Sequence, residues 1–312
     1  MKAIRGNAGK PVLVEVDEAP GHGELITMHV SGICASDFMY LQLGTERILG
    51  HELAGVREDG TPVAVEGLFG CGECAYCRSG RNNLCAQASR MALGIMQDGG
   101  MVEQFRVASH KLVELPDGLD VTNASLVEPG AVAWHGVRLG GTSPETTVAI
   151  VGGGSVGQLA AVAAQTQGAP EVALEVRYPH QHEIRERFAV GEPNGSYDIV
   201  IEAAGSASSI QRCVELVKPG GTIVVLGVVT GPLDIPFPSL LTKEVTLVAS
   251  VGYCGHPGKR EMADVAAMLA ARPEIADCLI THRFSLEDAP DAFRTAGDRH
   301  SGAVKVVVDI AS

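Results

Sequence analysis

The stretch Thr147-Val148-Ala149-Ile150-Val151-Gly152-Gly153-Gly154-Ser155-Val156-Gly157 decides the fold of the middle of the chain. A short apolar strand leads into a glycine-rich turn, and the Ala-rich residues 158–167 predict a helix. In this context a Gly-x-Gly-x-x-Gly turn binds a dinucleotide: Gly152 makes the turn, Gly154 lets the backbone approach the pyrophosphate, and Gly157 allows close helix packing. A glycine-rich turn without a ligand is the alternative. The residues expected to bind the cofactor here are Gly152, Gly154, Ser155, Val156 and Gly157.

Strands and helices alternate in the sequence that follows this turn. Residues 172–176, 198–202 and 222–226 read as further apolar strands, and residues 208–217 predict a helix between the last two. Such alternation predicts a parallel sheet with helices on both faces. We therefore expect a doubly wound α/β domain of the Rossmann type.

Four of the eight cysteines lie within fifteen positions of one another. The two-residue gaps let a tight turn aim successive thiolates at one point, and the last cysteine closes a tetrahedral shell of the kind that structural zinc requires. No open position remains in such a site, so the metal would hold a lobe in place rather than react. Four ordinary buried thiols are the alternative. The four cysteines are Cys71, Cys74, Cys77 and Cys85.

Three further candidate ligands are remote from one another in the sequence. They are Cys34 in Gly32-Ile33-Cys34-Ala35-Ser36-Asp37, His51 in Gly50-His51-Glu52, and Glu128 in Val127-Glu128-Pro129. A thiolate, an imidazole and a carboxylate could form a three-ligand zinc site with one position open for substrate. Composition alone does not bring these three side chains together.

The order of these motifs resembles the zinc-containing medium-chain dehydrogenases, which include alcohol, polyol and threonine dehydrogenases. Cys-x-Ser-Asp at residues 34–37 comes first, followed by Gly-His-Glu-x-x-Gly at residues 50–55. The four-cysteine lobe, Glu128-Pro129 and the dinucleotide turn then follow in the family's order. The resemblance covers essentially the whole chain and says little about the substrate.

The resemblance also implies the domain organisation. A GroES-like, β-rich catalytic domain would occupy residues 1–137, and residues 252–312 would return to it. The Rossmann domain would occupy residues 138–251. Between residues 178 and 197 the chain is shorter than the family pattern, so the dinucleotide sheet could lack a strand at one edge.

The family pattern implies that Cys34, His51 and Glu128 hold a catalytic zinc, which makes two zinc ions per chain with the cysteine lobe. Glu52 would stand beside this zinc as an occasional ligand or as a neighbour of the ligands. Two alternatives stay open: His51 could be a satisfied core histidine, and Glu128 could belong to a simple helix start with Pro129 at the first position.

The resemblance further implies roles for the residues around His51. Asp37 would orient His51 through the ring nitrogen that does not bind metal. Zinc would polarise the alcohol oxygen, hydride would pass to the nicotinamide, and Ser36 would take the proton. Met39 replaces a histidine found in some relatives, so the proton would leave through water or a ribose hydroxyl.

The residues at the ribose favour NADP over NAD. Alignment with the family pattern puts Val176 where NAD-binding members carry an acidic residue, and Arg177 and Tyr178 follow it. Without a carboxylate the 2′-phosphate is not repelled, so Arg177 could pair with it while Tyr178 stacks on adenine. A one-residue slip that brings Glu175 to the ribose would restore an NAD preference. Lys305 resembles a basic residue that relatives place near the cofactor, and a solvated strand lysine is the alternative.

Composition limits the classes of partner. A net charge of −13 argues against binding to nucleic acid or to an anionic membrane. No apolar run reaches the length of a membrane span, and the N-terminus leads straight into strand-like sequence, so we expect a cytoplasmic protein. In relatives the edge strand expected at residues 244–250 pairs across a dimer, which implies a homodimer or homotetramer.

The sequence therefore predicts a zinc-dependent oxidoreductase that moves hydride between a small alcohol or polyol and NAD(P). Two other functions stay open: NADPH-dependent reduction of a conjugated carbon–carbon double bond or an iminium on the same scaffold, and a non-catalytic nucleotide-binding protein. The second would predict lost zinc ligands, whereas Cys34, His51 and Glu128 are all present.

Overall fold

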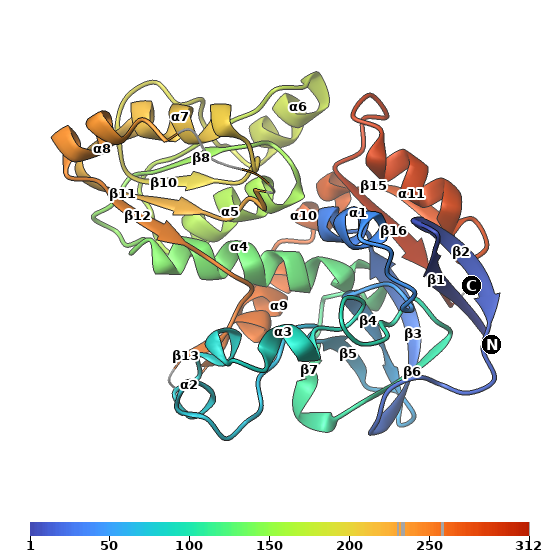
Figure 1. Cartoon of the computed structure of the whole chain (residues 1–312). Coiled ribbons are helices and arrows are strands. Elements are labelled where there is room, and N and C mark those ends of the chain that lie inside the picture. The colour runs from blue at the N-terminus through green and yellow to red at the C-terminus, as the bar shows by residue number, and fades with distance from the viewer. Residues whose placement is uncertain (230, 232–234, 257–258, 312) are drawn as a thin grey trace. The chain divides into compact units, whose positions relative to one another are not determined.

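The computed structural model describes residues 1–229, 231, 235–256 and 259–311. The chain forms two compact units (Figure 1). Unit 1 comprises residues 1–128 and 253–312, and unit 2 comprises residues 129–252. The expected first boundary, after residue 137, lies inside helix α4 (Val127–Leu139), and the units divide near the start of that helix.

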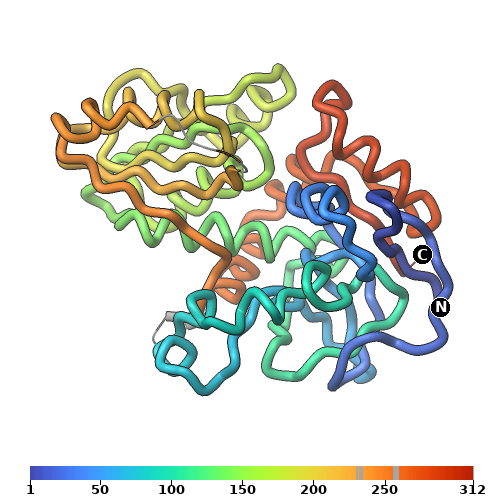
Figure 2. Tube along the Cα trace, viewed as in Figure 1, coloured from blue at the N-terminus to red at the C-terminus, as the bar shows by residue number. Residues whose placement is uncertain are grey.

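Unit 1 is built on a seven-stranded, mostly antiparallel sheet of order β15-β16-β3-β4-β5-β7, with β6 paired to β3. The C-terminal strand β16 pairs with β3, so the last segment of the chain lies beside the first third, as Figure 2 also shows. Hairpin β1–β2 forms a separate two-stranded sheet. The strands are β1 (Lys2–Asn7), β2 (Lys10–Glu15), β3 (Glu24–Gly32), β4 (Glu52–Arg57), β5 (Pro62–Val65), β6 (Gln104–Val107), β7 (Leu112–Glu114), β15 (Ile280–Ser285) and β16 (Lys305–Asp309).

Short helices and turns connect these strands and carry most of the candidate ligands. The helices of unit 1 are α1 (Ala35–Gln42), α2 (Ala75–Arg78), α3 (Ala88–Met91), α9 (Glu261–Ala271), α10 (Glu274–Leu279) and α11 (Ala289–Gly297). The 3-10 turns are η1 (Asn82–Leu84), η2 (Ser109–Lys111) and η3 (Val121–Leu126). A two-residue pair, β13 (Gly255–His256) with β14 (Lys259–Arg260), precedes α9.

Unit 2 is a doubly wound parallel sheet of order β12-β11-β10-β8-β9, with α7 and α8 over one face and α5 on the other (Figure 1). The strands are β8 (Val148–Val151), β9 (Val172–Glu175), β10 (Tyr197–Glu202), β11 (Val217–Val225) and β12 (Thr246–Ala249). The helices are α5 (Ser155–Thr166), α6 (Pro179–Arg187), α7 (Ala207–Leu216) and α8 (Phe237–Lys243). Helix α4 packs on this sheet through Gly136, where a Cβ would lie 2.4 Å from a methyl carbon of Leu226.

The expected loss of an edge strand is confirmed. After α6 the chain makes a single parallel bridge between Gly191 and Ala173, with Leu174 N donating to Gly191 O at 2.9 Å. This bridge stands beside β9, where a further strand would pair. The compressed segment is too short to return to the sheet as a full strand, so the described sheet ends at β9 with five strands.

Among the described residues, no helix is both long and apolar enough to span a membrane. The cytoplasmic location stays a prediction from the sequence.

Candidate active site

The first cluster of predicted site residues lies where β3 passes into α1. Cys34 stands just before the helix in extended backbone geometry, and its amide donates to Asp37 Oδ2 at 2.9 Å. This contact satisfies one of the free amide groups at the helix start and fixes the first turn. Ser36 and Asp37 belong to that turn, so one local motif positions three of the predicted side chains.

His51 comes to this turn from the start of β4. Its Nε2 atom lies 3.2 Å from Ser36 Oγ, and its Nδ1 atom lies 3.5 Å from Asp37 Oδ1. The preceding residue, Gly50, has φ +94°, a conformation that favours glycine. Asp37 therefore faces the ring nitrogen that the family pattern assigns to it, and the other nitrogen faces Ser36.

The cluster is buried and rich in negative charge. His51, Asp37 and Glu128 are 7%, 1% and 8% exposed. Burial alone would lower the pKa of His51, but Asp37, the Cys34 thiol and Glu128 together hold that pKa well above its usual value. Burial raises the pKa of Asp37 above its usual range, against the pull of His51.

Glu128 lies close enough to this cluster to interact with it. Burial raises the pKa of Glu128 to about 7, opposed by His51 and reinforced by Glu52. A buried carboxyl group is costly to ionise, and a nearby cation makes its ionised form favourable. A thiolate, an imidazole and a carboxylate also form the mixed donor set that catalytic zinc accepts. The residues present thus fit a zinc ion, although within the described chain the donor atoms of Cys34, His51 and Glu128 do not all lie within 4.8 Å of one another.

Glu52 and Lys305 form a buried ion pair next to the cluster. Lys305 Nζ donates to both carboxylate oxygens of Glu52 at 2.8 Å and to Ile33 O at 3.1 Å. Lys305 is 4% exposed, so the reading of a solvated strand lysine is wrong. The Lys305 ammonium makes three hydrogen bonds to oxygen atoms of unit 1. The predicted contact of Lys305 with the cofactor stays a prediction. At Gly32 a Cβ would lie 1.9 Å from Glu52 Oε2, so the pair requires glycine there.

The four cysteines of the lobe come together as predicted. The sulfur atoms of Cys71, Cys74, Cys77 and Cys85 all lie within 4.8 Å of one another, and none forms a disulfide. Separations of 4.0 Å between Cys71 and Cys77 and 3.5 Å between Cys74 and Cys77 are near the roughly 3.8 Å that tetrahedral zinc–thiolate bonds give. Backbone amides of Cys71 and Gln87 hold the pKa of the Cys85 thiol at about 6. This arrangement fits a tetrahedral metal ion.

The dinucleotide turn in unit 2 has the expected backbone. Gly152 has φ +125°, which favours glycine, and at Gly157 a Cβ would lie 1.8 Å from Gly152 O. At Gly154 a Cβ would meet nothing within 4 Å, so the turn is open on the side where phosphates would approach. Ser155 and Val156 form the first turn of α5.

Two side chains that the sequence did not single out fix the segment after β9. Gln181 Oε1 accepts from the amides of Arg177 and Tyr178 at 3.1 and 3.2 Å. The only sequence signal for this was a glutamine in the first turn of a helix. Arg212 Nε donates to Glu175 Oε2 at 2.6 Å, a contact from α7 that no local pattern predicts.

The same segment shows which side chain faces the turn. At Gly153 a Cβ would lie 2.7 Å from Val176, so Val176 rather than Glu175 points at the glycine-rich turn. Arg177 is exposed, and its guanidinium has no hydrogen bond or ion pair with the part of the chain that the structure describes. The Tyr178 ring stacks on His180, with ring centres 5.7 Å apart.

Comparisons with known proteins show the family to which the chain is similar. Residues 21–117 match the family model described as an alcohol dehydrogenase GroES-like domain, and residues 180–271 match the zinc-binding dehydrogenase model. The chain is 30% identical to L-galactonate-5-dehydrogenase of Escherichia coli over 298 residues, 85% of each chain. It is 29% identical to sorbitol dehydrogenase of Bacillus subtilis, over 99% of this chain and 97% of that one.

A solved structure gives the same result. A protein from Sinorhizobium meliloti, described as a zinc-binding dehydrogenase and solved bound to NADP, superposes with a TM-score of 0.84 at 30% identity. The superposition covers 99% of this chain and 98% of the other. These relatives favour alcohol and polyol oxidation over the reduction of a carbon–carbon double bond and over a non-catalytic role.

Proposed function

The chain belongs to the zinc-binding alcohol dehydrogenase family, and from this premise we propose that it oxidises a secondary hydroxyl of a polyol or sugar acid with NADP. The enzyme is an NAD(P)-linked oxidoreductase that transfers hydride reversibly between an alcohol and the nicotinamide. The substrate class rests on the relatives, which act as their names state on L-galactonate, sorbitol and xylulose. A polyhydroxylated substrate also suits a buried site rich in carboxylates, which can accept hydrogen bonds from several hydroxyls.

The arrangement of Ser36, His51 and Asp37 carries this proposal. Cys34, His51 and Glu128 would hold the catalytic zinc, which when bound supplies a Lewis acid for the alcohol oxygen. Asp37 faces His51 Nδ1 and keeps the ring turned so that Nε2 points at Ser36. The Ser36 hydroxyl lies 3.2 Å from that nitrogen, which would bind the metal, so Ser36 stands beside the place of the reacting hydroxyl. There Ser36 would accept the proton of the substrate and pass its own proton on to water or a ribose hydroxyl.

Two zinc ions per chain are part of the proposal. The lobe offers four sulfurs and no open position, so its ion would be structural. The cluster at His51 offers three ligands and a serine hydroxyl, so its ion would be catalytic.

The segment after β9 supports a preference for NADP. Glu175, the carboxylate next to the ribose position in sequence, is held by Arg212 at 2.6 Å, while Val176 faces the turn. The exposed guanidinium of Arg177 is then free to pair with a 2′-phosphate.

A homodimer or homotetramer completes the proposal. Strand β12 is an edge of the parallel sheet, and β12 and α8 expose apolar side chains. Leu247 on β12 is 43% exposed, and Phe237 and Leu241 on α8 are each 66% exposed. An exposed apolar edge strand is a surface that a second copy can cover.

The function is tested by following reduced-nicotinamide absorbance with a panel of polyols, sugar acids and simple alcohols, with NADP or NAD, before and after zinc chelation. We expect chelator-sensitive turnover that is fastest with a polyol or sugar acid and NADP. The Ser36→Ala variant should lose at least about a hundredfold in kcat. Absence of turnover with every alcohol, in protein that holds zinc and cofactor, would overturn the proposal and direct the search to carbon–carbon double bonds and iminium ions.

The cofactor preference has its own test. In the Arg177→Gln variant, kcat/KM with NADP should fall about tenfold while the value with NAD stays unchanged. Arg187→Gln is the matched control, because Arg187 is an exposed arginine on α6, the helix that follows Arg177. Equal losses with both cofactors would contradict the assigned role of Arg177.

A further inference from the structure

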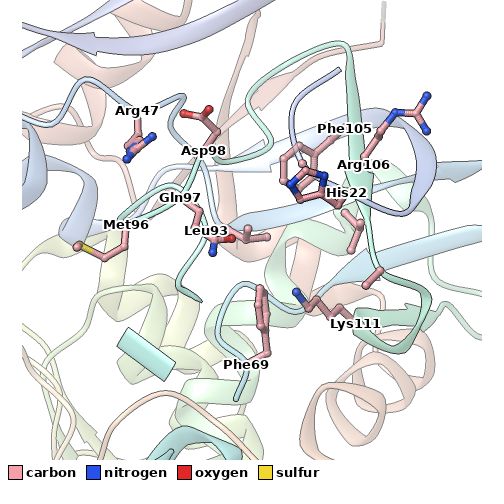
Figure 3. Close-up of a pocket in the computed structure, with 13 residues that line it drawn as sticks. His22, Arg47, Phe69, Leu93, Met96, Gln97, Asp98, Phe105, Arg106 and Lys111 are labelled. Atoms are coloured by element: carbon pink, nitrogen blue, oxygen red, sulfur yellow. The ribbon is translucent and has the colours of Figure 1, made fainter. Parts of the chain in front are cut away.

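Unit 1 holds a cavity of about 330 Å³ whose basic side chains do not converge (Figure 3). Arg47 and Arg106 lie on opposite sides of this cavity, and the Arg106 guanidinium donates to Gly23 O at 3.3 Å. These side chains therefore offer no common point for an anion. In unit 2, by contrast, several contacts converge on one side-chain oxygen beside the dinucleotide turn.

That oxygen is Oε1 of Gln181, in the first turn of α6. It accepts from the amides of Arg177 and Tyr178 at 3.1 and 3.2 Å. A Cβ at Gly153, the second glycine of the turn, would lie 2.6 Å from the same oxygen, so only glycine leaves room for it there. A single oxygen atom thus joins the dinucleotide turn to the segment that follows β9.

The backbone of Gln181 is held in turn by helix α5. Gln158 of that helix is fully buried, and its Nε2 atom donates to Gln181 O at 3.2 Å. Gln181 itself is also buried. Helix α5 begins at the dinucleotide turn, and its first turn is where phosphates would approach. The position of Gln181 Oε1 is therefore set by the same helix that would receive the pyrophosphate.

The two amides that Gln181 accepts belong to the residues expected at the adenosine end of the cofactor. Arg177 would pair with a 2′-phosphate, and Tyr178 would stack on adenine. When the backbone amides of both residues are fixed, the starting point of each side chain is fixed as well. Loss of Oε1 would take this acceptor from both amides and allow the segment to move.

The charge of Gln181 is as informative as its position. A glutamate at residue 181 could accept the same two hydrogen bonds and would form them more strongly, because they would be charge-assisted. It would also place a negative charge beside the segment that carries Arg177, where a phosphate dianion would bind, and like charges repel. A glutamine supplies the acceptor without that repulsion.

We propose that Gln181 is a positioning residue for the recognition of the 2′-phosphate of NADP. Its neutral oxygen holds the amides of Arg177 and Tyr178, so that the Arg177 guanidinium starts from a fixed point beside the turn. This role rests on the proposed function, which places NADP at the same turn.

The test is titration calorimetry of the zinc-loaded full chain with NADPH and with NADH, in the absence of any alcohol. In Gln181→Glu both amides keep an acceptor while a charge is added. We expect the affinity for NADPH to fall at least about tenfold and the affinity for NADH to stay within about twofold. A residue that only supported the fold would not separate the two cofactors in this way.

A second variant removes the acceptor without adding charge. In Gln181→Met we expect the affinity for NADPH to fall about tenfold, and hydrogen exchange of the Arg177 and Tyr178 amides to become faster. In Gln181→Glu the exchange of these amides should stay slow. Gln167→Met is the matched control, because Gln167 is a half-buried glutamine of unit 2 that donates to Trp134 O at 3.1 Å. This control should leave both affinities unchanged.

The outcomes separate the role of Gln181 from the proposed function. Equal losses of NADPH and NADH affinity in Gln181→Glu, or wild-type affinities in both Gln181 variants, would overturn the role. A wild-type chain that binds NADH more tightly than NADPH would instead contradict the proposed cofactor preference. If Gln181→Met does not fold, Gln181→Glu alone decides, because its carboxylate still accepts from both amides.

Discussion

Two groups of side chains in unit 1 that are suited to bind a metal differ in how closely their donor atoms lie together. In the lobe, all four sulfur atoms lie within 4.8 Å of one another. At the other group, Cys34 and His51 interact directly, whereas Glu128 completes no such group with them within the described residues. Both sets are suited to zinc, yet only the first is already assembled as a closed shell.

Sequence distance and charge explain the difference. The cysteines of the lobe span residues 71–85, and amide groups of the same segment donate to their sulfurs. The three proposed catalytic ligands come from three separate elements, and they share their buried surroundings with Asp37 and Glu52. Buried carboxylates near one another raise each other's pKa, and a bound cation would offset that repulsion. A closed site thus serves stability, and an open one leaves room for Ser36 and a substrate.

The largest effect should follow from removing a ligand of the open site. In Cys34→Ala we expect kcat to fall about a thousandfold, equivalent to roughly 4 kcal/mol of transition-state stabilisation. Metal analysis should find one zinc per chain instead of two. The Tm should change by only a few degrees, because the lobe keeps its ion. Retention of both zinc ions in this variant would sink the assignment of Cys34 as a ligand.

Removing a ligand of the closed site should have the opposite pattern. In Cys85→Ser we expect the Tm to fall by about 12 °C, since a structural zinc contributes several kcal/mol to folding. Turnover per remaining catalytic zinc should stay near the wild-type value at low temperature. The buried Cys278 provides the control: Cys278→Ser removes a thiol outside both groups and should leave the zinc content at two. A Cys85→Ser protein with unchanged Tm and zinc content would erase the distinction between the two sites.

The sequence predicted the closed site better than the open one for the same physical reason. Cysteines separated by two residues lie in one short segment, so their sulfur atoms can meet without help from the rest of the fold. Cys71 to Cys85 were therefore predictable as a unit. The fingerprint turn was equally predictable, because Gly152 and Gly157 are required by backbone geometry. The missing edge strand followed from a simple deficit in chain length.

Contacts between distant elements were beyond local patterns. The partner of Lys305 is Glu52, 253 residues away, and the partner of Glu175 is Arg212, which lies on another element. Neither pair has a characteristic spacing, and both depend on strand order. The role of Gln181 was not predicted. Its side-chain Oε1 accepts from two amides in a segment that the sequence alone identifies only as a turn.

A smaller effect is expected at the Glu52–Lys305 pair, which lies next to the open site. In Lys305→Met the buried carboxylate of Glu52 loses the ammonium that donates to both of its oxygens, which should cost about 3 kcal/mol of unfolding free energy. The double variant Glu52→Gln with Lys305→Met removes both charges and should recover most of the loss. Denaturant unfolding measures both. If the double variant is no more stable than Lys305→Met alone, the pair does not act as a charge pair.

Asp37 offers the finest distinction, because it touches His51 without being a ligand itself. Asp37→Asn keeps the shape of the side chain, and its carbonyl oxygen can still accept from the amide of Cys34, so the helix start should survive. The negative charge beside His51 Nδ1 is lost. The ring therefore loses its preference for the orientation in which Nε2 faces Ser36. We expect kcat and the affinity for the catalytic zinc to fall between about tenfold and a hundredfold, with the lobe's zinc and the Tm little changed. Excess zinc should restore part of the activity of Asp37→Asn and none of that of Cys34→Ala. The loss of an orienting residue only weakens zinc binding, whereas the loss of a ligand destroys the site.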